Sequence, residues 1–140
     1  MSRRFFQSER NANLLIDVLR SCVAANEFKL HDFVIMPDHV HLLITVSEDT
    51  SIERAMQLIK GRFSFRMKRE AGFPGELWQK GFSEVRIFDD EAYSQFRTYI
   101  AQNPVKAGLV QASLEYPFSF NSLAAKRSAA NALAPTEVIP

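Results

Sequence analysis

The sequence has 140 residues, of which 46% are hydrophobic and 24% are charged, and this is the size and composition of one soluble globular domain. Its formal net charge is only +1, so the overall charge does not indicate a nucleic-acid partner, and any basic surface must be local. The single cysteine, Cys22, excludes an internal disulfide and fits a reducing compartment. No apolar run reaches the length of a membrane span, and the first residues lack the apolar core of a signal peptide. We therefore expect a cytoplasmic protein with no membrane partner.

The first predicted elements are a helix and a hairpin. Apolar residues recur at helical spacing through residues 8–25, and Ser8 is available as an N-cap. Residues 29–36 and 39–46 are rich in β-branched and aromatic types, which favour strands. A turn at Pro37 separates the two runs, so they pair most simply as an antiparallel hairpin.

A long second helix is predicted within residues 48–70. Thr50 and Glu53 have the spacing of a capping box, and apolar residues follow at helical spacing. The segment GFPG ends this helix, and residues 77–88 then indicate a loop that leads into an irregular strand.

A third helix is predicted over residues 90–102, where acidic residues gather at the start, and we expect Pro104 to limit its extension. Residues 124–140 have the composition of a disordered tail. The order helix, two strands, helix, strand, helix predicts an α+β fold with an antiparallel sheet. A ferredoxin-like sheet would also need a strand before the first helix, and residues 3–6 are barely long enough for one.

Two histidines occur inside the second strand. Because side chains alternate across a strand, His39 and His41 point to one face and Val40 to the other. Such a pair can bind a metal ion through both rings, although two histidines at this spacing are more often incidental. Candidate oxygen ligands to complete the site are Gln102 and Asn103, at the end of the third helix.

One tyrosine shares a helix face with a candidate ligand, because Tyr99 and Asn103 are four residues apart. A half-buried tyrosine with its hydroxyl in water is the more common outcome of such spacing. The neighbouring amides favour the other interpretation, a phenol placed near a phosphate and a metal. Pro104 disfavours helical geometry at the residue before it, so Gln102 remains an alternative donor to Asn103.

The second predicted helix carries a run of basic residues, with no acidic residue from Arg54 to Arg69. A charge run usually marks a solvated helix surface, but such surfaces normally mix both signs, which favours a phosphate-binding patch here. Phe63 and Phe65 lie among the basic residues and could stack on nucleobases, although core packing is favoured for Phe63. The residues expected to bind DNA are Lys60, Arg62, Arg66, Lys68 and Arg69.

The segments FVIMPDHVHLLI, QLIKGRFSFRMKR, LWQKGF, YIAQNPVKAGLV and YPFSF follow one another in an order found in one known family. Residues 5–120 resemble the single-tyrosine HUH transposases, an insertion-sequence family, and especially their REP-associated tyrosine transposase branch. The resemblance implies a ferredoxin-like α+β core, an antiparallel sheet with helices on one face. We expect the first edge strand of that sheet to be short or missing in this chain. The resemblance also implies a single HUH transposase-like domain over residues 1–123.

The resemblance also implies roles for single residues. His39 and His41 would bind a divalent metal, Mg²⁺ or Mn²⁺, Asn103 would be the third ligand, and Tyr99 would be the nucleophile. The implied activity is metal-dependent nicking and strand transfer of single-stranded DNA through a 5′-phosphotyrosine intermediate. The implied partner is DNA with hairpins like those of repetitive extragenic palindromes, and a homodimer is compatible with it. The alternative function is a domesticated protein that binds structured single-stranded DNA or RNA without cleaving it.

Overall fold

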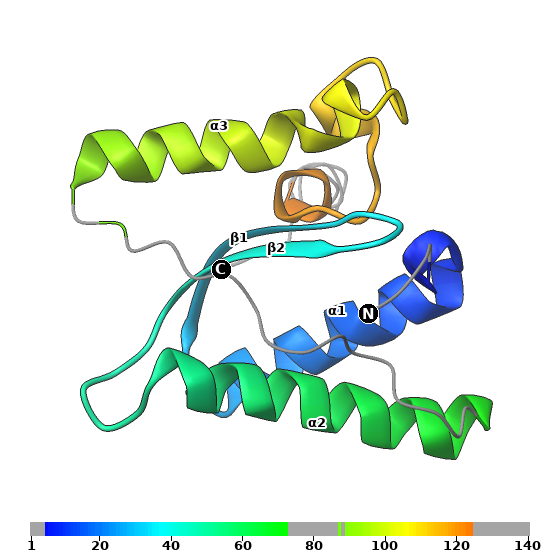
Figure 1. Ribbon diagram of the computed structural model, residues 1–140, viewed down its shortest axis with the longest axis vertical. Coiled ribbons are helices and arrows are strands. Elements are labelled where there is room, and N and C mark those ends of the chain that lie inside the picture. Colours follow the sequence, from blue (N-terminus) through cyan, green and yellow to red (C-terminus); the bar gives the residue numbers. More distant parts are fainter. Residues whose placement is uncertain (1–4, 73–86, 88, 125–140) are drawn as a thin grey trace, which may run out of the picture.

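The computed structural model describes residues 5–72, 87 and 89–124. Figure 1 shows a two-stranded sheet between two helical layers, with α1 and α2 on one side and α3 on the other. The elements are η1 (Phe5–Gln7), α1 (Glu9–Ala24), β1 (Lys29–Ile35), β2 (Val40–Thr45), α2 (Ile52–Ala71), α3 (Asp90–Lys106) and η2 (Ser113–Glu115).

Some sequence predictions fall outside the described residues. These are the tail after residue 124, most of the strand expected within residues 77–88, and the first part of the expected edge strand. Phe5–Gln7, the described part of that edge segment, is a 3₁₀ helix. The domain boundaries stay a prediction. Among the described residues, no helix has both the length and the apolar character needed to cross a membrane.

Helix α1 forms where the apolar spacing predicts it. The Ser8 hydroxyl oxygen accepts a hydrogen bond from the amide of Asn11 (3.3 Å), which confirms the predicted N-cap. The helix ends at Ala24, and the chain reverses through Asn26, which has a positive φ of 58°. Cys22 is completely buried.

The predicted hairpin is confirmed. β1 and β2 are antiparallel, with Ile35 opposite Val40 and Val34 opposite His41. The amide of Met36 donates a hydrogen bond to the carbonyl oxygen of His39 (2.8 Å), which closes the turn. The register between the strands shifts once, because β1 contains a β-bulge near its start.

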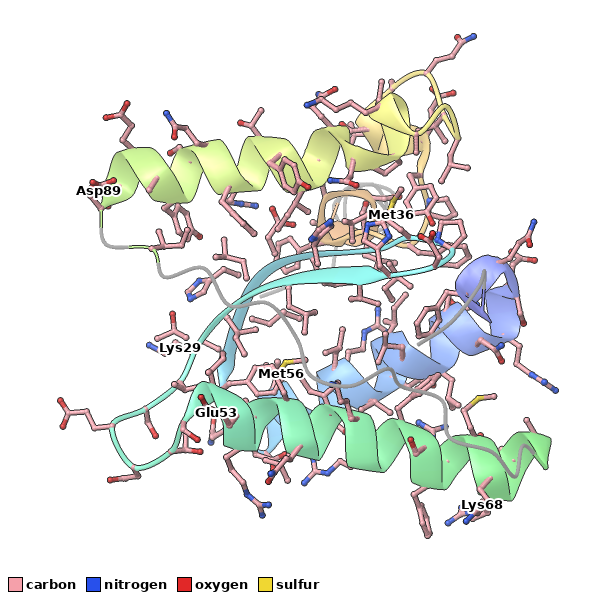
Figure 2. All side chains as sticks on the ribbon, viewed as in Figure 1. Lys29, Met36, Glu53, Met56, Lys68 and Asp89 are labelled. Carbon is pink, nitrogen blue, oxygen red and sulfur yellow. The ribbon has the colours of Figure 1, made fainter. Side chains whose placement is uncertain are left out.

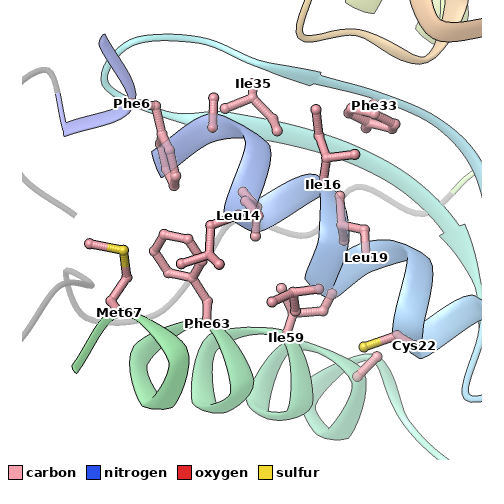
Figure 3. Close-up of a cluster of buried hydrophobic side chains, with 14 of the residues drawn as sticks. Phe6, Leu14, Ile16, Leu19, Cys22, Phe33, Ile35, Ile59, Phe63 and Met67 are labelled. Atoms are coloured by element: carbon pink, nitrogen blue, oxygen red, sulfur yellow. The ribbon is translucent and has the colours of Figure 1, made fainter. Parts of the chain in front are cut away.

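Both faces of β1 are buried. Phe33 and Ile35 pack on one face against α1 and α2, whereas Val34 and Met36 pack on the other against α3 (Figures 2 and 3). We call these two groups the α1–α2 cluster and the α3 cluster. The core of the α1–α2 cluster includes Phe6, Leu15, Leu19, Phe33, Ile35, Ile59, Phe63 and Met67, and that of the α3 cluster is Val34, Met36, Leu43, Ile100 and Tyr116.

The α+β fold with an antiparallel sheet is confirmed, but the helices do not all lie on one face. The physical reason is the composition of β1, whose apolar side chains alternate onto both faces. A sheet with two apolar faces needs a cover on each side. α3 supplies the second cover.

Helix α2 begins and ends at clear local signals. Its N-cap is Ser51, whose hydroxyl oxygen accepts from the amide of Arg54 (3.1 Å), and not the expected Thr50 one residue earlier. Its C-cap is Gly72 in the left-handed region (φ 67°), a conformation that glycine adopts without a Cβ clash. Its buried face consists of Ala55, Ile59, Phe63 and Met67.

Helix α3 is longer than predicted. Asp89 caps it by accepting from the amide of Ala92 (2.8 Å), and the helix then continues through Pro104 to Lys106. A proline removes one helical hydrogen bond, but Pro104 is buried, and its packing offsets that loss. As a result Asn103 stays helical, so the argument that favoured Gln102 over it does not hold.

The segment after α3 returns to the sheet beside β1. Ser119 forms an isolated antiparallel bridge with Val34, and the amide of Ile35 donates to the carbonyl oxygen of Phe118 (2.9 Å). The buried Tyr116 hydroxyl donates to the carbonyl oxygen of Ile35. This segment therefore satisfies backbone groups along the outer edge of β1.

Two phenylalanines on α2 should differ strongly in their effect on stability. Phe63 is fully buried, with its ring centroid 5.5 Å from that of Phe6, whereas Phe65 is 62% exposed. We expect Phe63→Ala to lower the free energy of unfolding by about 3–5 kcal/mol, because it leaves a cavity in the α1–α2 cluster. Phe65→Ala should change it by less than about 0.5 kcal/mol. Urea denaturation of both variants checks this, and equal losses would contradict the assignment of Phe63 to the core.

Candidate active site

The two histidines of the HVH segment lie side by side on the α3 face of the sheet. The ring centroids of His39 and His41 are 4.8 Å apart, and the rings are nearly perpendicular, at 81°. Val40 and Leu42 alternate with them and pack against the α1–α2 cluster instead. The face assignment made from strand alternation is therefore confirmed by the geometry.

Helix α3 brings Tyr99 to this pair. The Tyr99 ring centroid lies 5.3 Å from that of His41, in an edge-to-face arrangement, and 5.9 Å from that of Phe96. Tyr99 is nevertheless 46% exposed, so its contacts leave much of the side chain open to solvent and to a ligand. Residues that are 58 positions apart along the chain, 41 and 99, thus form one partly open site.

Asn103 lies one helical turn after Tyr99. Its amide nitrogen Nδ2 donates to the carbonyl oxygen of Tyr99 (3.3 Å), which leaves the oxygen Oδ1 as the atom able to bind a cation. Gln102, the alternative donor, is exposed on the same helix. Within the part of the chain that the structure describes, no three His, Cys, Asp or Glu side chains form a metal site. The candidate donors for a divalent ion therefore stay those expected from the sequence, the two imidazoles and an amide oxygen of α3.

The two histidines have different electrostatic surroundings. Burial lowers the pKa of His41, and the neighbouring charge of His39 lowers it further. A lowered pKa keeps the His41 ring neutral near pH 7, and the neutral ring has the free lone pair that a metal ligand needs.

Asp38 is a site residue that the sequence analysis missed. Its Oδ1 lies 2.7 Å from Nδ1 of His39. A carboxylate that accepts from Nδ1–H fixes the tautomer and leaves the lone pair of Nε2 for a metal, which is the usual arrangement behind a histidine ligand. A signal is present in the sequence, because Asp38 directly precedes His39 in the turn that begins at Pro37.

The basic helix α2 is not part of this site. It covers the opposite face of the sheet from α3 (Figure 1), and Figure 2 shows Lys68 near the end of α2, far from α3. The five residues expected to bind DNA, Lys60, Arg62, Arg66, Lys68 and Arg69, therefore form a surface separate from the histidine pair.

Two of these arginines are already paired with carboxylates. Arg62 forms two hydrogen bonds with Glu27, which comes from the loop after α1, and Arg66 binds Glu70 through Nε (2.6 Å). Arg66 also lies 3.9 Å from a carboxylate oxygen of Asp17 on α1. The run from Arg54 to Arg69 gives no sign of these acidic partners, because they lie outside it in the sequence.

A shallow groove of about 370 Å³ runs between α1 and α2. Phe65 lines it and is largely exposed, and the guanidinium carbon of Arg69 lies 5.8 Å from the centroid of the Phe65 ring. An exposed aromatic ring beside a cation is suited to stacking on a nucleobase whose phosphate contacts the cation.

An α+β fold with a histidine pair facing a tyrosine on a helix is the arrangement implied by the resemblance to single-tyrosine HUH transposases. Residues 1–103 match the family model of the IS200-like transposases, and the chain belongs to this family.

Relatives with known names support the same branch. The chain is 30% identical to a REP-associated tyrosine transposase of Escherichia coli K12 over 93 residues, which are 66% of this chain and 53% of that protein. A Haemophilus influenzae protein that carries the same name provisionally is 32% identical over 95 residues, 61% of this chain and 54% of its own. The ISDra2 transposase TnpA of Deinococcus radiodurans is 28% identical over 95 residues, with 64% of this chain and 67% of that protein covered.

A solved structure of a relative has a similar fold. A REP-associated tyrosine transposase bound to a REP hairpin superposes with a TM-score of 0.64 at 27% identity, covering 96% of this chain and 74% of the other. The chain spans about half the length of the first two curated relatives.

The pKa of His41 can be tested in the metal-free protein. We expect an NMR titration to place it below the ordinary histidine value, and His39→Ala to raise it, because the substitution removes the nearby charge. The folded state binds this proton less tightly than the unfolded chain. His41 therefore contributes stability above its unfolded pKa, and this is lost as the pH falls through the folded pKa. A His41 pKa that does not move in His39→Ala would exclude the charge of His39 as a cause.

Proposed function

We propose that this chain nicks single-stranded DNA and transfers the cut strand, with Tyr99 as the nucleophile. The observation that carries the proposal is the contact between the rings of Tyr99 and His41, which come from different elements. A half-buried tyrosine is common, but one whose ring lies against a histidine pair is also placed where its phenol could reach a phosphate held there. The names of the relatives and the family membership support the same activity.

The proposed chemical step is a transfer of a phosphodiester to the phenol. The phenol loses its proton, and the Tyr99 oxygen forms a bond to phosphorus. The bond from phosphorus to the 3′ oxygen breaks, and that oxygen takes up a proton to give a free 3′ hydroxyl. The 5′ phosphate stays on the tyrosine, so the energy of the phosphodiester is conserved for rejoining to another 3′ hydroxyl.

The proposed cofactor is a divalent metal, Mg²⁺ or Mn²⁺, held by His39, His41 and Asn103. Two imidazoles favour manganese or a later metal by intrinsic affinity, while the higher abundance of magnesium in cells favours that ion. When bound, such an ion polarises the phosphate and lowers the cost of the charge that develops on it. Asp38 orients the His39 ring for this role.

The proposed substrate is single-stranded DNA that carries a hairpin. One relative of known structure is bound to a REP hairpin. In this chain, the exposed end of α2 supplies Lys68, Arg69 and the ring of Phe65 for contacts with DNA. Arg62 and Arg66 take part less directly, because carboxylates already bind them. We further propose that the protein acts in the cytoplasm. A homodimer is compatible with the proposed function.

Tyr99→Phe tests the nucleophile with the loss of one oxygen. The variant keeps the ring that packs against Phe96 and His41, so folding and hairpin binding should survive. Wild-type protein mixed with Mg²⁺ and a hairpin oligonucleotide labelled on the 3′ side of the cut should give a protein–DNA adduct on a denaturing gel. Tyr99→Phe should give none, a loss of at least about 10³-fold.

Tyr116→Phe and a chelator are the matched controls for this experiment. Tyr116 has its hydroxyl bound to the carbonyl oxygen of Ile35, so Tyr116→Phe should still form the adduct. Removal of divalent metal from the wild type should abolish it. An adduct in Tyr99→Phe would place the nucleophile elsewhere. Hairpin binding with no adduct in the wild type would favour the non-cleaving binder instead.

The salt dependence of binding tests the exposed end of α2. We expect Lys68→Gln with Arg69→Gln to weaken binding to a single-stranded oligonucleotide. The slope of log affinity against log salt should fall by roughly 0.7 for each lost phosphate contact. Arg54→Gln removes one positive charge, against two in the double variant, from the opposite end of α2, and it should leave the slope nearly unchanged. Equal slopes for wild type and the double variant would show that this end of α2 is only a solvated surface.

A further inference from the structure

A buried carboxylate faces α3 because of the β-bulge in β1. The register pairs Leu30 with Ile44 and Asp32 with Leu43, so His31 is the extra residue. In a regular strand Leu30 and Asp32 would share a face. Instead Leu30 packs on the α1–α2 cluster, while Leu43, the partner of Asp32, belongs to the α3 cluster. The bulge therefore turns Asp32 toward α3, which is a recognised use of such irregularities.

Asp32 meets an arginine from the helix that carries Tyr99. The Asp32 side chain is only 2% exposed, and its Oδ2 accepts a hydrogen bond from Nε of Arg97 (3.1 Å). The other oxygen, Oδ1, accepts from the amide of Phe33 (2.9 Å). Arg97 also donates through Nη2 to Asn121 (3.4 Å), and its guanidinium carbon lies 6.0 Å from the centroid of the Tyr93 ring. Both charged groups are thus held by several contacts.

Stabilisation of the folded state is a poor explanation for the ion pair of Asp32 and Arg97. Burial raises the pKa of Asp32, against the opposing effects of the hydrogen bond and charge of Arg97 and of the Phe33 amide. The cost of removing the carboxylate from water is therefore only partly offset. Buried polar pairs of this kind are better attested as devices that fix register.

The apolar packing of α3 does not by itself fix the position of the helix along the sheet. α3 covers the sheet with a short apolar stripe, in which only Ile100 and Pro104 are buried. Apolar contacts are not directional and tolerate sliding. A slide of one helical turn would move Tyr99 by about 5.4 Å along the helix axis and separate it from His41. A charge-assisted hydrogen bond at one point has no equivalent partner one turn away.

We propose that Asp32 and Arg97 form a latch that fixes α3 along the sheet and thereby holds Tyr99 beside the histidine pair. Arg97 is a positioning residue in this proposal. It lies two residues before Tyr99, and its hydrogen bond reaches the same strand whose Val34 is opposite His41. The role in adduct formation rests on the proposed function, but the position of Tyr99 does not.

The test separates positioning from stability. Arg97→Met alone leaves a buried carboxylate without its cation and could unfold the protein. The informative variant is therefore Asp32→Asn combined with Arg97→Met, which removes both charges and keeps the side chains close to their original size. Its matched control is Ile59→Val, which deletes one buried methyl in the α1–α2 cluster, away from α3.

Two measurements are made on both proteins. The first is the nuclear Overhauser effect between the rings of Tyr99 and His41, which needs no substrate or metal. The second is the rate of adduct formation with the hairpin oligonucleotide and Mg²⁺, compared with the midpoint of thermal unfolding. We expect the double variant to lose most of the ring-to-ring signal and to react at least tenfold more slowly, since displacement by 1 Å can cost about 10²-fold. Ile59→Val should keep the ring-to-ring signal and the wild-type rate of adduct formation, whatever its unfolding midpoint. Arg97→Lys, which retains the charge, should be intermediate.

The latch is overturned if the double variant keeps the full ring-to-ring signal, because Tyr99 is then positioned without it. It is also overturned if the rate follows the unfolding midpoint equally in the double variant and in Ile59→Val. If the wild type forms no adduct, the proposed function fails, and the ring-to-ring signal alone still decides whether the latch positions Tyr99.

Discussion

The two apolar faces of the hairpin β1–β2 are the constraint on which the rest of the structure depends. The sheet has two strands in the part of the chain that the structure describes, and a hairpin of two strands is only marginally stable unless other elements pack against it. Phe33 and Ile35 are covered by α1 and α2, and Val34 and Met36 are covered by α3. The candidate active site is a consequence of the second cover, because the helix that buries this face also carries Tyr99. The packing of α3 that buries Val34 and Met36 therefore also brings Tyr99 to the histidine pair.

Apolar packing determines the layers, and polar contacts determine the positions within them. Burial stabilises contact between α3 and the sheet over a range of relative positions. Asp32 with Arg97 and Asp38 with His39 add directional hydrogen bonds on the same face as the site. One pair relates the helix to the strand, and the other orients an imidazole. One of these carboxylates, Asp32, is buried and the other, Asp38, is exposed, yet both make directional contacts on the face that carries the histidine pair.

Local signals made much of this predictable from the sequence. The Ser8 cap and the HVH alternation each depend on neighbours a few residues apart, and both are confirmed. Features that depend on distant residues were missed or wrong. Pro104 is tolerated inside α3 because tertiary packing buries it, and Arg62 is neutralised by Glu27 from another part of the chain. Which face α3 covers, and the bulge that turns Asp32 toward it, likewise require the assembled sheet. The roles of the site residues in catalysis stay predictions.

The separation of α2 from α3 by the sheet limits how one DNA molecule can contact both. α1 and α2 cover one face of the sheet and α3 covers the other, so a DNA strand that contacts both α2 and α3 must pass around the sheet. A strand with its scissile phosphate at Tyr99 would meet Arg69 only well away from the cut. In the proposed function, the exposed end of α2 would therefore hold a flanking part of the DNA, and its basic residues are too remote from Tyr99 to stabilise the reacting phosphate.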